Sequence, residues 1–225
     1  MKKTNDLKRS IEVTIKASIE EPEDHIVFQV VNTEKNQDML KKAPHRRFLD
    51  LSIIYALTNE FGQFLILVTD QIAETHGWSE EQLFQMAMRN TKSLFPFKVM
   101  RMCSFLFENS MELFGVLPYE DDIYEPGPDD EEMWVLTNEQ KVNGCTVLLY
   151  EELFHRLAER LGSDLYLLPS SRHEIIAVSS KVAEWAPLSS IVPEVNEEVV
   201  DEEDFLSDSV YRYDRISRGF SVVEE

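Results

Sequence analysis

The chain has 225 residues, of which 43% are hydrophobic and 28% charged, and its 22 Lys and Arg against 42 Asp and Glu give a formal net charge of −20. This length and composition are typical of a globular protein and exclude collagen-like repeats, coiled-coil arrays and disorder throughout. The negative charge argues against a general binder of nucleic acid or of anionic membranes, because both surfaces are polyanionic.

In chain order, residues that alternate with period two predict strands, and apolar residues at helical spacing predict helices. A capping box at Ser79–Gln82 begins one helix, and Gly77 ends another. The Met and Phe content of the 99–114 helix suits core packing and would also suit a groove for a partner helix. In the first half, strands are predicted over 11–19, 25–31, 48–57 and 63–69, with a hairpin connection at 58–62, and helices over 32–42, 70–76, 79–94 and 99–114.

The second half repeats this mixture of strands and helices. A turn at Asn143-Gly144 precedes a predicted helix, and Gly162 ends it. Strands are predicted over 133–137, 165–168 and 174–178, helices over 146–161 and in the second half of 185–200, and a terminal hairpin over 209–223. Without strict alternation of strand and helix, the pattern predicts an α+β fold with a mixed or antiparallel sheet and flanking helices. We expect an N-terminal strand and arm over 1–24 and a single domain over 25–225.

The acidic residues are concentrated in two segments that contain no Lys or Arg. Residues 119–132 hold eight carboxylates and residues 194–208 hold eight more, which leaves the other 196 residues at a net charge of −4. The first segment contains Pro126-Gly127-Pro128, which breaks regular structure. We therefore expect 119–132 to be a mobile, exposed acidic loop inside the domain.

The cysteine spacing and the N-terminal residues indicate the cellular compartment in which we expect the protein. Cys103 and Cys145 form no C-x-x-C pair, so we expect free thiols. The N-terminus is basic, but no apolar stretch of signal-peptide length follows it, and the longest apolar runs are far too short to cross a bilayer. These features predict a cytoplasmic, reducing location and no membrane association.

Motifs for metals and cofactors are incomplete in this sequence. His173-Glu174 begins like the zinc-protease pattern H-E-x-x-H, but Ala177 occupies the second ligand position. The 119–132 segment lacks the calcium-loop pattern, and neither Gly-rich phosphate loop occurs among the seven glycines. We expect no metal and no cofactor.

One cluster resembles part of a hydrolase site: Ser170, Ser171, His173 and Glu174. A nucleophilic hydroxyl needs a base within ~2.6–3.2 Å and a third group that orients the base. If the cluster continues one extended strand, Ser171 and His173 share a face and Glu174 points away. The segment alone therefore makes no triad, and the alternative is a structural junction in which His173 bonds backbone or a carboxylate such as Asp208. Distant residues that would complete a site are His45, Asp50, Asn138 and Asp208.

Several strings are more particular than propensity alone would produce. They are V-N-T-E-K-N at 31–36, P-H-R-R-F-L-D-L at 44–51, R-N-T at 89–91, V-L-T-N at 135–138, G-S-D-L-Y-L-L-P-S-S-R-H-E at 162–174, P-E-V-N at 193–196 and L-S-D-S-V-Y at 206–211. In this order they resemble a family of proteins from gut Firmicutes, the domain-of-unknown-function family numbered 5688. The resemblance extends from about His25 to Arg215, and it implies no particular activity.

Three classes of function follow from these features. The lack of a complete catalytic motif and the acidic segments favour a non-catalytic interaction or regulatory protein with a protein partner. The alternative is a hydrolase with a site around Ser171, His173 and Asp208. The third is an acidic decoy that mimics DNA, which would need carboxylates in spaced rows rather than in two clusters. We expect no binding of nucleic acid, and the sequence gives no indication of oligomeric state.

Overall fold

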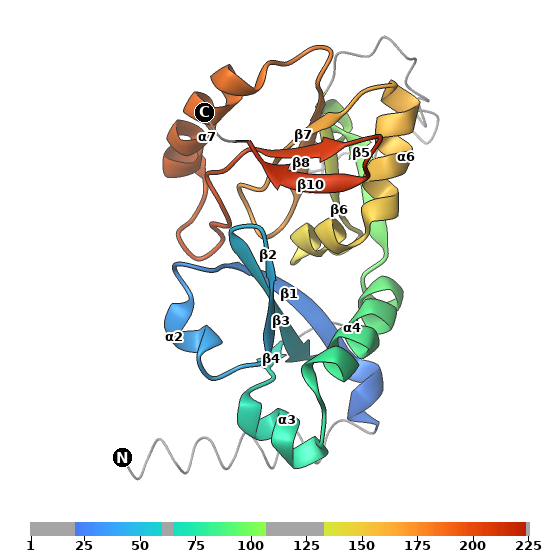
Figure 1. Ribbon diagram of the computed structural model, residues 1–225, viewed down its shortest axis with the longest axis vertical. Helices are drawn as coiled ribbons and strands as arrows, with labels where there is room; N and C mark the ends of the chain where they lie inside the picture. The colour runs from blue at the N-terminus through green and yellow to red at the C-terminus, as the bar shows by residue number, and fades with distance from the viewer. Residues whose placement is uncertain (1–20, 60–64, 107–132, 224–225) are drawn as a thin grey trace, which may run out of the picture. The chain divides into compact units, whose positions relative to one another are not determined.

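The computed structural model describes residues 21–59, 65–106 and 133–223, which form helices and antiparallel sheets (Figure 1). The predicted α+β class is confirmed. The strand predicted over 11–19 and the acidic loop predicted over 119–132 lie outside the described residues.

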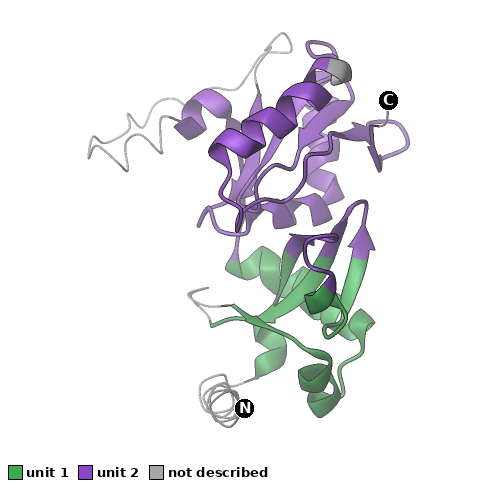
Figure 2. Cartoon of the chain, turned by 90° about the vertical axis from the view of Figure 1, so that its left-hand side faces the viewer, with its two compact units in different colours: residues 1–29, 38–46, 53–94 green, residues 30–37, 47–52, 95–225 purple. Residues whose placement is uncertain are grey.

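By its internal contacts the chain divides into two compact units (Figure 2). Unit 1 takes residues 1–29, 38–46 and 53–94, and unit 2 takes residues 30–37, 47–52 and 95–225. The division passes through three strands of one sheet, which has the order β1-β3-β2 with β4 beside β3. These strands are β1 (Ile26–Asn32), β2 (His45–Phe48), β3 (Leu51–Leu57) and the short β4 (Ile66–Leu67). The predicted boundaries at 1–24 and 25–225 stay a prediction.

The described helices of unit 1 are η1 (Pro22–His25), α2 (Gln37–Leu40), α3 (Asp70–His76) and α4 (Glu80–Leu94). Of these, α3 and α4 lie within one residue of the helices predicted over 70–76 and 79–94. The capping box is confirmed, because the Ser79 amide donates to Gln82 Oε1 at 2.9 Å and the Gln82 amide to Ser79 Oγ at 3.3 Å. Gly77 ends α3 with a φ of 70°. On α4, Leu83 and Ala87 are buried, and Thr91 Oγ1 accepts from the amide of Phe28 at 2.9 Å.

Several elements predicted in the first half are wrong in extent or type. Of the strand predicted over 63–69, only Ile66–Leu67 form a strand among its described residues. The helix predicted over 32–42 is a turn followed by only α2, and the strand predicted over 48–57 is interrupted by the turn at Leu49-Asp50. The helix predicted to begin at Val99 starts instead with strand β5 (Phe97–Arg101), and only 102–106 are helical among its described residues. The reason is tertiary: β5 pairs along its whole length with a neighbouring strand, which overrides local helical preference.

Unit 2 is built on a six-stranded sheet whose neighbouring strands are antiparallel, in the order β10-β9-β7-β8-β6-β5. The strands predicted near 133–137, 165–168 and 174–178 and the terminal hairpin are confirmed. Besides β5, they are β6 (Trp134–Asn138), β7 (Leu165–Leu168), β8 (Ile175–Ser179), β9 (Tyr211–Asp214) and β10 (Gly219–Val222).

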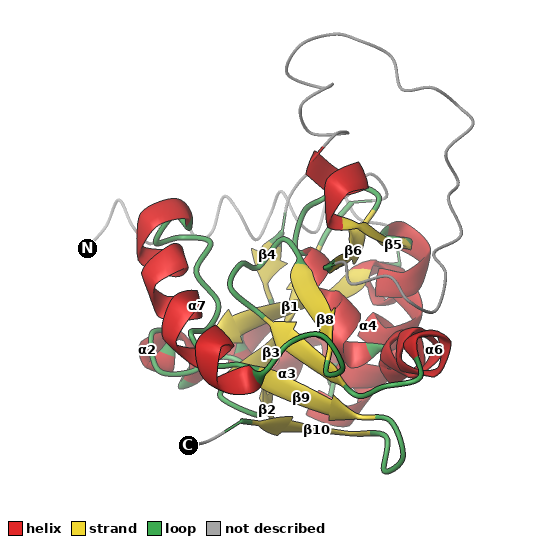
Figure 3. Ribbon diagram, turned by 90° about the horizontal axis from the view of Figure 1, so that it is seen from above, coloured by secondary structure: helices red, strands yellow, loops and turns green. Residues whose placement is uncertain are grey.

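Helices α6 (Glu151–Leu161) and α7 (Trp185–Val199) cover opposite faces of this sheet (Figures 1 and 3). Phe154 of α6 packs against Tyr213 and Phe220, with its ring centroid 6.1 Å from that of Tyr213 and 5.2 Å from that of Phe220. On the other face, Val192 of α7 packs in a cluster with Leu168 and Val210. Unit 2 is therefore a sheet held between two helices.

Both helices differ from their predicted extents. The helix predicted over 146–161 is a 3-10 helix, η2 (Gly144–Leu149), followed by α6, and Gly162 ends it with a φ of 63°. Helix α7 occupies all of 185–199 although only its second half was predicted. Pro187 lies in the first helical turn, where an amide would have no helical acceptor, and Pro193 is accommodated inside the helix.

Gly144 is the position where the fold most clearly requires glycine. A Cβ there would lie 2.1 Å from both His173 O and Thr137 Oγ1. We expect Gly144→Ala to lower the free energy of unfolding by about 3 kcal/mol, because the backbone carbonyl of His173 cannot move away without disturbing the chain around it. Gly219→Ala is the control, since its Cβ would meet only Ser217 Oγ at 3.5 Å. Chemical denaturation measures both, and equal stabilities would contradict this close approach.

Candidate functional site

Asp50 lies in the two-residue turn between β2 and β3. Its neighbour Leu49 has a φ of 55°, a conformation that is uncommon for a residue with a side chain and persists where the surroundings impose it. Two hydrogen bonds hold the turn: Thr33 N donates to Asp50 O at 3.2 Å, and Arg47 Nε donates to Leu49 O at 3.1 Å. The turn thereby fixes the position of the Asp50 carboxylate.

That carboxylate accepts hydrogen bonds from three hydroxyl groups of the 206–211 segment. Ser207 Oγ and Ser209 Oγ donate to Asp50 Oδ2 at 2.6 and 3.2 Å, and the Tyr211 hydroxyl donates to Oδ1. Ser207 is 1% exposed and Tyr211 is fully buried. Buried hydroxyl groups need acceptors, and the one carboxyl group of Asp50 accepts from all three.

Backbone and amide contacts extend this cluster to other motif segments. Leu206 N and Ser207 N donate to the carbonyls of Ser170 and Pro169, each at 2.9 Å. Asn32 Nδ2 donates to Leu206 O at 2.9 Å, and Asn196 Nδ2 donates to Ser207 O at 3.1 Å and to Asp208 Oδ1 at 2.8 Å. We call this set the Asp50 network; its side chains are Asn32, Asp50, Asn196, Ser207, Ser209 and Tyr211. It joins the strings at 31–36, 44–51, 193–196 and 206–211.

Ser171, His173 and Glu174 form a second polar cluster. Residues 172–174 are not a strand, and β8 begins only at Ile175, so the expected alternation of faces does not apply. Ser171 Oγ accepts from the His173 amide at 3.0 Å. Burial raises the pKa of Glu174, although neighbouring His173 and Ser171 oppose the shift.

The imidazole of His173 has a different partner from the one suggested by the sequence. Its Nε2 lies 3.2 Å from Asp204 Oδ1, whereas the carboxylate of Asp208 bonds Asn196. Arg172 Nε lies 2.7 Å from the same Asp204 oxygen, and the Arg172 amide donates to Asp204 O at 2.8 Å. The carbonyl of His173 accepts from Thr137 Oγ1 at 2.7 Å. His173 is therefore anchored on both its side chain and its backbone.

The residues predicted as a site fall into separate local contacts. Asp50 belongs to the Asp50 network. Asn138 instead bonds the loop that follows it: its Nδ2 donates to Val142 O at 2.7 Å, and its Oδ1 accepts from Val142 N at 3.2 Å. His45 belongs to unit 1, where its Nδ1 lies 2.9 Å from Ala43 O. Among the described residues, no three His, Cys, Asp or Glu side chains are arranged as metal ligands.

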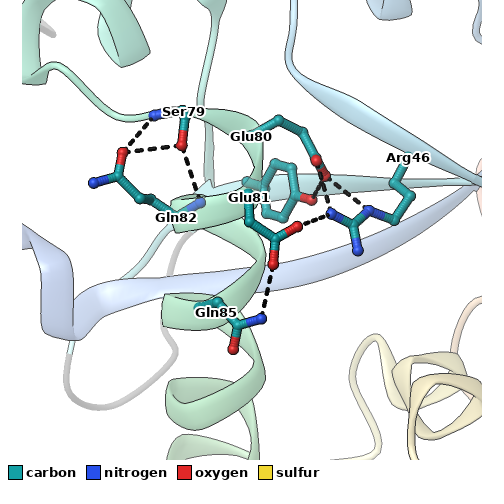
Figure 4. A network of polar contacts seen from close by, with 7 residues as sticks. Arg46, Ser79, Glu80, Glu81, Gln82 and Gln85 are labelled. Atoms are coloured by element: carbon teal, nitrogen blue, oxygen red, sulfur yellow. Dashed lines mark hydrogen bonds and ion pairs between the residues drawn. The ribbon is translucent and has the colours of Figure 1, made fainter.

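Unit 1 contains a charged network that the motif search did not identify (Figure 4). Arg46 of β2 binds Glu80 through Nε and Nη2 at 3.1 and 2.8 Å, and Nη2 also lies 2.7 Å from Glu81 Oε2. The Tyr55 hydroxyl donates to Glu80 as well. The Glu80 hydrogen bond, supported by Glu81, raises the pKa of Arg46, so the guanidinium is charged throughout the ordinary pH range. The network joins β2 and β3 to the start of α4.

The chain was compared with known protein families, curated proteins and solved structures. The model of a family described as a family of unknown function (DUF5688) matches residues 1–215. No curated protein and no solved structure matches the chain.

Removing the Asp50 carboxylate should destabilise the protein, because buried hydroxyls of Ser207 and Tyr211 would lose their acceptor. We expect Asp50→Ala to lower the free energy of unfolding by about 3 kcal/mol, given a cost of about 1–3 kcal/mol for each unpaired buried group. Asp208→Ala, at an exposed carboxylate in the same segment, should cost less than half of that. Chemical denaturation of the two variants tests this, and equal losses would contradict a central role for Asp50.

Alkaline pH should unfold the protein through its buried tyrosines. Burial and the Asp50 hydrogen bond raise the pKa of Tyr211, and burial and Glu80 raise that of Tyr55. Their stabilising effect is complete below the ordinary tyrosine pKa of about 10 and is lost as the pH rises above it, because only the unfolded chain then ionises. Denaturation at a series of pH values, followed by tyrosinate absorbance, measures the loss. In Tyr211→Phe the free energy of unfolding should decline less steeply with pH. Ionisation of all seven tyrosines in the folded protein near pH 10 would refute the raised pKa values.

Proposed function

Because the chain belongs to this family of unknown function, which brings no activity with it, we propose from its own geometry that it is a non-catalytic interaction or regulatory protein. The observation that carries the proposal concerns the polar cluster of Ser171, His173 and Glu174. In it the Ser171 hydroxyl and the His173 imidazole have different partners. Ser171 is 7% exposed and its Oγ accepts from the His173 amide at 3.0 Å, while the imidazole Nε2 lies 3.2 Å from Asp204 Oδ1. A nucleophilic mechanism needs these two groups to bond each other.

The acidic segment at the end of α7 supplies the interaction surface in this proposal. Its carboxylate residues between 194 and 203 are exposed, and they are Glu194, Glu197, Glu198, Asp201, Glu202 and Glu203. Exposed charge of one sign attracts partners of the opposite sign and speeds their association. The partner in this proposal is a protein with a basic surface, and neither nucleic acid nor a cofactor is part of it.

A hydrolase is the second candidate, and one observation favours it. The His173 imidazole is oriented by a carboxylate, and Ser171 lies three positions before the half-buried Glu174, whose pKa burial raises, a combination found at catalytic sites. In this version Asp204 takes the role first considered for Asp208. The decoy hypothesis and a cytoplasmic location in a Firmicutes bacterium stay predictions. No described helix is both long and apolar enough to cross a membrane.

Thermal unfolding separates the first two candidates. If the cluster is structural, His173→Ala should cost about 1 kcal/mol, and Asp204→Ala at least as much, because it removes the contact with Arg172 as well as that with His173. A loss of that size lowers the melting temperature by about 2–4 °C in a protein of this length. Asp201→Ala, an exposed carboxylate in the same segment, should leave it unchanged.

The same variants are assayed for hydrolysis of a panel of ester and peptide substrates. The interaction proposal expects no hydrolysis by the parent protein above the buffer rate. Turnover that disappears in both Ser171→Ala and His173→Ala, with melting temperatures equal to that of the parent, would replace it with the hydrolase.

A further inference from the structure

Helix α7 has apolar residues on two adjoining sides, and the described part of the chain covers only one of them. On the covered side, Val192 and Asn196 are 4% and 3% exposed, and Leu188 packs against the cluster around Val192. The other side carries Ile191, Val195 and Val199, which are 50%, 44% and 72% exposed. We call these three residues the α7 stripe. Residues four apart share a helix face, so the stripe is continuous along the helix.

Helix formation alone does not account for these residue types. Ile and Val are β-branched and lose rotamer freedom in a helix, so an exposed helical position is better served by Ala, Glu, Lys or Arg. Three β-branched apolar residues in a row on an exposed face therefore cost helix stability without adding to the core. Exposed apolar residues grouped on one face are typical of a surface that contacts a partner.

The charge beside the stripe specifies the chemistry of that partner. Glu194 and Glu198 are also four apart and each immediately precedes a stripe residue, so they form an exposed acidic row along it. Residues 182–211 contain no Lys, Arg or His. A second copy of this helix would bring like charges together, and an anionic membrane would be repelled. A basic, amphipathic partner satisfies both the apolar stripe and the acidic row.

We infer that the α7 stripe docks a basic amphipathic helix of a partner protein. Apolar side chains of the partner cover Ile191, Val195 and Val199, and its Lys or Arg side chains pair with Glu194 and Glu198. From 191 to 199 the stripe spans about 12 Å, which matches two to three turns of a partner helix. The inference rests on the proposed interaction function and names its surface and partner.

The probe is a fluorescently labelled helical peptide of Leu and Lys, with Leu on one face and Lys on the other. Binding to the full chain is followed by fluorescence anisotropy, and its location by NMR mapping of amide chemical shifts. We expect the peptide to bind and to shift the amides of 191–199. A scrambled peptide of equal composition should bind at least about tenfold more weakly, a difference that corresponds to about 1.4 kcal/mol.

Matched variants separate the stripe from the general acidity of the chain. Ile191→Ser with Val199→Ser should weaken binding about tenfold, while Ile216→Ser, at an 80% exposed apolar residue elsewhere in unit 2, should not. Glu194→Gln with Glu198→Gln should weaken binding, and more so than Glu34→Gln with Glu139→Gln, which removes the same charge from exposed sites elsewhere in unit 2. Circular dichroism checks that each variant is folded.

The possible results decide the inference in either direction. Selective loss with the α7 variants and shifts confined to 191–199 support it. Equal loss with the control charge variant, no effect of the stripe variant, or failure of the peptide to bind the parent chain overturns it. If the peptide binds elsewhere, the α7 surface is wrong while the interaction function stands; substrate turnover in the hydrolysis assay would instead remove the interaction function.

Discussion

The Asp50 carboxylate is the interaction on which the polar centre of unit 2 depends. Hydroxyl groups of Ser207, Ser209 and Tyr211 come from one short segment, and two of these residues are almost completely buried. Burial of a hydroxyl is unfavourable unless it finds an acceptor, and the single carboxyl group of Asp50, in a tight turn, accepts from all three. The same segment continues into β9 of the six-stranded sheet, so the turn at Asp50 fixes where that strand begins. Leu49 maintains an unusual backbone conformation to achieve this.

The elements that the sequence predicts correctly are those with local signals. The capping box at Ser79–Gln82, the left-handed Gly77 and Gly162, and the short apolar strands β7 and β8 all carry their information within a few residues. Elements predicted wrongly are decided by partners far along the chain. The 97–101 segment contains residues compatible with a helix, but β6 more than thirty positions later offers it a complete ladder of backbone hydrogen bonds.

The same distinction explains the candidate site. The sequence identified Asp50, His173 and Asp208 as polar residues in particular strings, but not their partners. Asp50 lies 157 positions from Ser207, and whether His173 faces Asp204 or Asp208 depends on how the loop before β9 is paired with Ser170 and Arg172. The Arg46 network had only an indirect signal, two glutamates in a capping box and an arginine in the string at 44–51. A single sequence can indicate which polar residues matter, but it does not show which of them contact one another in the folded chain.

The division of the chain into units has a consequence for how the protein can be taken apart. Each unit is assembled from three separate stretches of sequence, and β1, β2 and β3 each contribute residues to both. No single cut in the polypeptide therefore releases either unit whole, and neither corresponds to a contiguous reading frame that recombination could move to another gene. Removal of the last third of the chain would also strip Asp50 of its hydroxyl partners. The two units are inherited together, as one piece of sequence.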